Sequence, residues 1–172
     1  MSACNKVIDT KEDDAVSTQM INMEELVPCS HEEVDTRIFV HARRAVRHGS
    51  TIMIKASDTD VIVIAVSVLP SLQQSGLQQL WVSFGQGNNL RWITVHELCL
   101  AIGLAKTRQI LFFHAFIGCD VVSAFRGEGK KSAWLTWDVY TEVSDVFAKL
   151  SQYPLTADDE DLQILEKFGY YV

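Results

Sequence analysis

The chain has 172 residues, of which 48% are hydrophobic and 22% charged, which excludes a disordered chain and is enough for one folded domain. It contains four cysteines but no C-x-x-C pair, which argues against a zinc ribbon or a thioredoxin-type site. The net charge of −7 comes from the two ends, because residues 1–30 and 154–172 each carry −4, whereas residues 31–153 carry +1. The middle of the chain is therefore compatible with nucleic-acid binding, which requires cations.

The first third of the chain predicts a polar lead-in, a helix and a strand. Residues 1–28 are polar with weak periodicity. Ser30 and Glu33 form a capping-box pattern ahead of apolar residues at helical spacing, and Gly49 ends this helix. Residues 51–55 are short, apolar and β-branched, as expected of a buried strand. Residues 57–66 form either a helix capped by Ser57 or a further strand, because periodicity alone does not separate the two.

The remainder predicts a hairpin followed by helices. We expect a polar loop over residues 70–79, and strands at 80–84 and 90–94 around a glycine-containing turn. Helices are expected at about 95–103, 106–117 and 130–140, with a turn at 121–129 and one or two helices within 141–172. The pattern predicts an α/β fold, a small sheet covered by helices. We expect one core shared by Ile52, Ile54, Ile62, Ile64, Phe112 and Phe116.

Acidic residues stand at three boundaries between these elements. Glu33 and Asp35 open the first helix, Asp58 and Asp60 follow the strand, and Asp120 comes after the helix that ends near residue 117. Carboxylates that converge on one sheet edge stay ionised together only if cations neutralise them. Mg²⁺ is the usual hard cation, and two ions about 4 Å apart clamp a phosphodiester. The alternative is that these acids only cap helices and complement their dipoles.

Taken in order, these residues resemble the motifs of flap-endonuclease-type, PIN-like nucleases. Glu33-Val34-Asp35 resembles the E-x-E motif, Ser57-Asp58-Thr59-Asp60 resembles E-D-x-D, and Ile117-Gly118-Cys119-Asp120 resembles L-G-x-D. Residues 124–133 (AFRGEGKKSA) resemble the S-I-R-G-I-G-P-K-R-A segment that opens the family's helix-two-turn-helix. The order and rough spacing agree across residues 29–140.

The resemblance implies a metal-dependent nuclease that hydrolyses phosphodiesters of DNA. It assigns the binding of Mg²⁺ or Mn²⁺, and with it catalysis, to Glu33, Asp35, Asp58, Asp60 and Asp120. It also implies a division of the chain into a lead-in over 1–28, a PIN-like domain over 29–153 and an acidic helix or tail over 154–172. The helix-two-turn-helix-like segment would cover about 121–140, and its contacts with DNA phosphates would come from Arg126, Gly127, Gly129, Lys130 and Lys131.

A second group of cations lies on one face of the first predicted helix, where Arg37 and Arg44 flank His41 at helical spacing. Such a face is either simply solvated or a contact surface for phosphates. If the five acids named above are neutralised by metal, residues 31–153 carry twelve Lys and Arg against six acids. This balance favours nucleic acid as the partner. His114 is expected to be a hydrogen-bonded core residue, and Trp134 and Trp137 are expected to pack rather than stack on bases.

The sequence also departs from the family pattern. Lys130 replaces a proline, Asp35 is shorter than the family's glutamate, and residues 1–28 contain no counterpart of the first strand with its catalytic Asp or of the arch. We therefore expect a PIN-like fold without these parts, whose nuclease activity is weak or absent in this chain alone. A protein partner or an N-terminal segment would complete the fold. The alternatives are a non-catalytic nucleic-acid- or partner-binding remnant and a purely structural α/β module.

With no secretory leader and no apolar run of about 20 residues, we expect an intracellular protein, nuclear or cytoplasmic.

Overall fold

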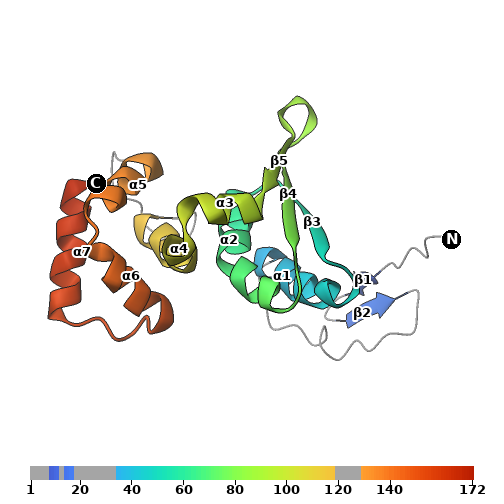
Figure 1. Cartoon of the computed structure of the whole chain (residues 1–172), viewed down its shortest axis with the longest axis horizontal. Helices are drawn as coiled ribbons and strands as arrows, with labels where there is room; N and C mark the ends of the chain where they lie inside the picture. Colours follow the sequence, from blue (N-terminus) through green and yellow to red (C-terminus); the bar gives the residue numbers. More distant parts are fainter. Residues whose placement is uncertain (1–7, 12–13, 18–33, 119–128) are drawn as a thin grey trace.

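The computed structural model describes residues 8–11, 14–17, 34–118 and 129–172. Two lobes lie side by side along its long axis (Figure 1): a sheet lobe, residues 34–103, and a helical lobe, residues 104–118 and 129–172. Within the lead-in, β1 (Ile8–Lys11) and β2 (Asp14–Ser17) form an antiparallel pair that is separate from the main sheet.

The sheet lobe contains a three-stranded mixed sheet in the order β3-β4-β5. Strands β3 (Thr51–Ala56) and β4 (Gln79–Phe84) are parallel, and β5 (Arg91–Thr94) pairs antiparallel with β4. Helices α1 (Val34–Ala45), α2 (Thr59–Gln74) and α3 (Val95–Ile102) share a core with one face of this sheet. The other face is open, and its residues Met53 and Trp92 are 61% and 54% exposed.

The predicted helix, strand and hairpin of this lobe are confirmed. A short 3-10 turn, η1 (Val46–His48), extends α1 to Gly49. The segment over 57–66 is helical rather than extended, and Asp58, not Ser57, caps it, because the Asp58 side chain accepts the backbone N–H of Asp60 at 3.0 Å. The hairpin turn contains η2 (Gly87–Asn89) and needs glycine at Gly85, since φ is 89° and a Cβ would lie 2.6 Å from a backbone oxygen.

The expected loop from Pro70 to Gln79 is wrong in its first half, because α2 continues through Pro70 to Gln74. A proline inside a helix removes one N–H and leaves the carbonyl four residues earlier without its usual donor. Here that carbonyl belongs to Val66, and it accepts the thiol of Cys99 from α3 at 3.7 Å. Burial of Leu69 and Leu72 on both sides of Pro70 further stabilises this last turn of the helix.

The helical lobe consists of α4 (Leu104–Ile117), α5 (Lys130–Val139), α6 (Val143–Gln152) and α7 (Asp159–Tyr171). Its core is aromatic, with Trp137 and Phe147 fully buried and Phe113 stacked on Trp137 at 4.7 Å between ring centroids. The predicted packing role of Trp134 and Trp137 is confirmed, since their rings meet each other and Phe113.

The expectation of a single core is wrong. Ile54 is buried in the sheet lobe with Ile52, Ile62 and Ile64 against that core, whereas Phe112 and Phe116 pack against the core of the helical lobe. Helix α4 explains the division, because its Ile110 faces the first core while residues closer to its end face the second. The broader prediction, an α/β fold with a small sheet covered by helices, is confirmed.

In the described parts of the chain, no single helix is long and apolar enough to cross a membrane. Helices α3 and α4 reach that length and composition only together, and they are bent by 100° where they meet. Both contribute residues to the protein's cores.

Candidate functional site

The candidate site is centred on Asp58 and Asp60, where the chain leaves the carboxyl end of β3 and enters α2. Asp58 occupies the N-cap position, and its Oδ1 accepts the backbone N–H of Asp60 at 3.0 Å. Both carboxylates therefore lie at the positive end of the helix dipole. This capping bond uses one of the two oxygens of Asp58.

Asp60 is held from the opposite side by a residue far away in the sequence. The Nε2 of His114 on α4 lies 3.0 Å from Oδ1 of Asp60, and the two side chains are 12% and 32% exposed. Because an ionised carboxylate only accepts hydrogen bonds, a bond to such a carboxylate requires the proton on Nε2 of His114. The prediction that His114 is hydrogen-bonded is confirmed, but its partner could not be read from the sequence, in which the two residues stand 54 positions apart.

The His114 bond fixes the last turn of α4 against the first turn of α2. Helix α4 ends at Gly118, whose φ of 114° is strained for residues with a side chain. Asp120 is only two residues further along the chain, although Asp120 itself lies outside the described residues. The structure therefore describes the chain up to Gly118, but not the carboxylate of Asp120.

Helix α1 starts at the same end of the sheet as α2. Its last turn precedes β3, and Arg43 there donates from Nη2 to Oγ of Ser71 in the last turn of α2 at 3.3 Å, so the two helices run in parallel. Asp35 is half-buried in the first turn of α1, and Glu33 directly precedes this helix, outside the described residues.

The basic face of α1 is half-buried rather than fully solvated. In the part of the chain that the structure describes, Nε and Nη2 of Arg37 and Nη1 of Arg44 are buried without a hydrogen-bond partner. Burial, and then the charges of Arg37 and Arg44, lower the pKa of His41 between them. Buried N–H groups without partners cost free energy, which an anion that accepts their hydrogen bonds would recover.

The candidate cations of the helical lobe are exposed, unlike those of α1. Lys130 and Lys131 are exposed in the first turn of α5, and Gly129 is its N-cap. A Cβ at Gly129 would meet no atom of the described residues within 4 Å, and its φ of −91° suits any residue, so the described part of the fold does not require glycine there. Arg126 and Gly127, predicted to contact phosphate, lie outside the described residues.

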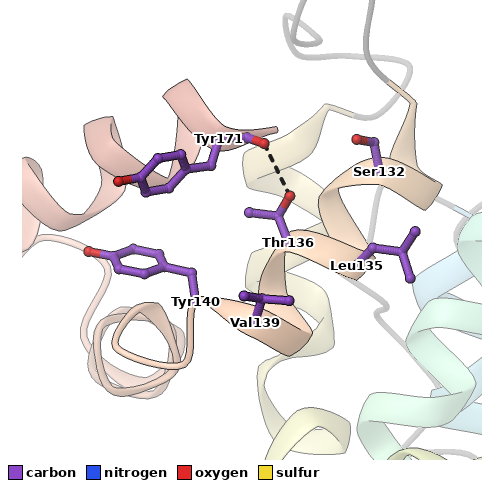
Figure 2. Close-up of a pocket in the computed structure, with 6 residues that line it drawn as sticks. All are labelled: Ser132, Leu135, Thr136, Val139, Tyr140 and Tyr171. Atoms are coloured by element: carbon purple, nitrogen blue, oxygen red, sulfur yellow. Dashed lines mark hydrogen bonds between the residues drawn. The ribbon is translucent and has the colours of Figure 1, made fainter.

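A groove of about 480 Å³ lies between α5 and the end of α7, away from the carboxylates (Figure 2). The hydroxyls of Ser132 and Thr136 donate to the carbonyls of Val172 and Tyr171, at 2.9 and 3.3 Å. The described lining is otherwise apolar or tyrosine, with no carboxylate or imidazole. This groove therefore offers surface for packing but no group for acid–base chemistry near neutral pH.

The described part of the candidate metal site consists of two carboxylates, Asp58 and Asp60. Among residues 8–11, 14–17, 34–118 and 129–172, no group of three or more His, Cys, Asp or Glu side chains is arranged to hold an ion, so Asp35 does not complete such a set with Asp58 and Asp60. Mg²⁺, however, usually keeps several waters and binds through one or two carboxylates plus substrate phosphate. The hard oxygen donors of Asp58 and Asp60 fit this minimal set.

No family model matches this chain, and no curated protein or solved structure does so either. The resemblance to PIN-like nucleases therefore stays a prediction from the motifs.

Proposed function

We propose that this chain is a metal-dependent, PIN-like nuclease domain that hydrolyses phosphodiesters of nucleic acid, with DNA as the expected substrate. The observation that carries the proposal is the 3.0 Å hydrogen bond between Asp60 and His114. It joins the first turn of α2, next to Asp58, to the last turn of α4. Asp120 follows three positions after the end of α4 in the sequence and lies outside the described residues.

In this proposal, Asp58 and Asp60 hold Mg²⁺ or Mn²⁺, and Glu33, Asp35 and Asp120 are the further candidate ligands. When bound, the cation supplies neutralisation of the phosphate charge and a lower pKa for an attacking water. The chain's own groups position the ligands: the capping bond sets Asp58 relative to the backbone of α2, and His114 sets Asp60.

The cations around the site are assigned to the substrate backbone. Arg37 and Arg44, whose buried nitrogens have no hydrogen-bond partner among the described residues, are assigned to donate to phosphate oxygens, because charge-assisted hydrogen bonds from guanidinium groups are strong. Lys130 and Lys131, at the exposed start of α5, are assigned to a second stretch of backbone, together with Arg126, Gly127 and Gly129.

The test is cleavage of labelled flap, hairpin and single-stranded DNA in Mg²⁺ or Mn²⁺. We expect weak, metal-dependent cleavage that is lost when Asp58→Asn is combined with Asp60→Asn, and also in Asp120→Asn. The Asp120 variant should keep or tighten its DNA binding, because a negative charge near phosphate is removed. A matched control, Asp159→Asn with Glu160→Gln, changes the charge equally on exposed residues of α7 and should leave cleavage intact. Cleavage that survives in the Asp120 variant would contradict the assignment.

The second candidate is a non-catalytic nucleic-acid-binding domain of the same fold. It is favoured by the absence, among the described residues, of a group of three side chains arranged for a metal. This candidate predicts salt-dependent DNA binding that Mg²⁺ does not alter, and no cleavage by any form of the chain.

A further inference from the structure

We propose that His114 is a positioning residue for Asp60, a role that rests on the proposed function. Its Nε2 lies 3.0 Å from one oxygen of Asp60, which would leave the second oxygen of this carboxylate for the cation. Asp60 is thus the carboxylate whose orientation depends on the helical lobe, whereas Asp58 is set within the sheet lobe by its own capping bond.

The surroundings of the two residues support this role. Asp60 stands in the first turn of α2 with a side chain that is 32% exposed, so without a partner it could sample several rotamers. The imidazole of His114 is only 12% exposed, and its helix is held by Phe113 and Ile117, which are buried in the aromatic core. A fixed donor therefore meets a carboxylate that would otherwise be free to rotate, and the bond selects one orientation.

A merely structural bond between α2 and α4 makes a different prediction. It would change the stability of the protein and leave the affinity for metal unchanged, as long as the chain folds. Residues that orient a metal ligand instead typically change metal affinity or activity by about 10–100-fold when they are replaced. Metal affinity, measured separately from folding, thus separates the two roles.

The experiment measures Mn²⁺ affinity by electron paramagnetic resonance and calorimetry, with thermal denaturation without metal as a check on folding. His114→Leu keeps the apolar volume and removes the donor, and we expect its Mn²⁺ affinity to fall by about 10-fold or more. His114→Gln retains an N–H donor of similar reach and should recover most of this loss. When Asp60→Asn is already present, His114→Leu should cause no further loss, because the two residues act as one unit.

The outcomes separate this inference from the proposed function. If the wild-type chain does not bind Mn²⁺, or if Asp58→Asn with Asp60→Asn binds it equally well, the metal site itself is wrong. If that double variant loses Mn²⁺ but a folded His114→Leu chain binds it as the wild type does, the positioning role is overturned.

A measurement on the wild-type chain applies even if His114→Leu does not fold. Nitrogen-15 NMR of the histidine side chains reports which ring nitrogen of His114 carries the proton. The proposal requires the proton on Nε2, because the carboxylate of Asp60 can only accept. A neutral ring with its proton on Nδ1 alone would overturn the proposal.

Discussion

The cores of the two lobes are built from different residue types. The helical lobe has an aromatic core, with Trp137, Phe147 and Phe168 fully covered, while its tyrosines Tyr153, Tyr170 and Tyr171 are exposed. The sheet lobe has a mainly aliphatic core and leaves Trp92 half-exposed on the open face of its sheet. The described carboxylates of the candidate site belong to the sheet lobe, and the helical lobe contributes His114 from a helix that its aromatic core holds. The aromatic core and the candidate carboxylates Asp58 and Asp60 thus lie in different lobes, and His114 joins them.

The sharpest test of this division is a pair of tryptophan substitutions. Trp137→Ala removes a fully buried ring that stacks on Phe113 and donates from Nε1 to Ser144, and it should cost about 3–5 kcal/mol of unfolding free energy. Trp92→Ala, on the open sheet face, should cost about 1 kcal/mol or less, since it removes one cross-strand contact. Chemical denaturation measures both, and equal losses would contradict the contrast between the lobes.

The next largest effect concerns metal. Mg²⁺ or Mn²⁺ at about 100 times its Kd should stabilise the folded chain by about 2.7 kcal/mol. Asp58→Asn combined with Asp60→Asn should abolish this gain in the melting temperature, whereas Asp159→Asn combined with Glu160→Gln in the helical lobe should retain it. A metal-induced shift of equal size in both double variants would show that Asp58 and Asp60 are not the ligands.

Salt dependence compares the cations of the two lobes. The log–log slope of DNA affinity against salt should fall by up to about 2 in Lys130→Ala with Lys131→Ala, since each lost phosphate contact removes about 0.9. Arg37→Ala with Arg44→Ala should lower this slope by a similar amount. The same double variant also removes the two positive charges that lower the pKa of His41. If one pair leaves the slope unchanged, its lobe does not contact the DNA backbone.

The smallest expected effect is the pH dependence that His41 gives to the sheet lobe. Burial and the neighbouring Arg37 and Arg44 lower the pKa of His41 below its ordinary value of 6.5. The unfolded chain therefore takes up more protons than the folded one as the pH falls through this value, and stability is lost on acidification. His41→Gln should flatten the fall in unfolding free energy between about pH 7 and pH 5. The exposed His48, substituted in the same way, is the control, and an unchanged slope in His41→Gln would count against this explanation.

Much of the fold could be predicted because it depends on local patterns. The β-branched run of β3, the glycine turn of the hairpin and the capped helices are encoded by residues that are neighbours in the sequence. The continuation of α2 past Pro70 could not be predicted from the local sequence, since a proline usually ends a helix and the partner of the freed Val66 carbonyl, Cys99, comes from another helix. The division into two cores likewise depends on how α4 lies between the lobes.

The candidate site was only partly accessible from the sequence. The position of Asp58 and Asp60 directly after an apolar strand was sufficient to single them out, and the structure places both at the start of α2. No local pattern reports that His114 contacts Asp60, or that nitrogens of Arg37 and Arg44 are buried, because both facts arise from packing between elements. The predictions for Glu33 and Asp120 concern residues outside the described ranges.

The most direct test of the central claim is a crystal structure of this chain grown with Mn²⁺ and measured at the manganese absorption edge. We expect an anomalous peak in contact with the carboxylates of Asp58 and Asp60, with His114 still bonded to Asp60. The carboxylate of Asp120 should lie within about 8 Å of Asp58, because ligands of shared metals must converge. A structure with no anomalous peak at Asp58 and Asp60, or with Asp120 far from them, would contradict the claim.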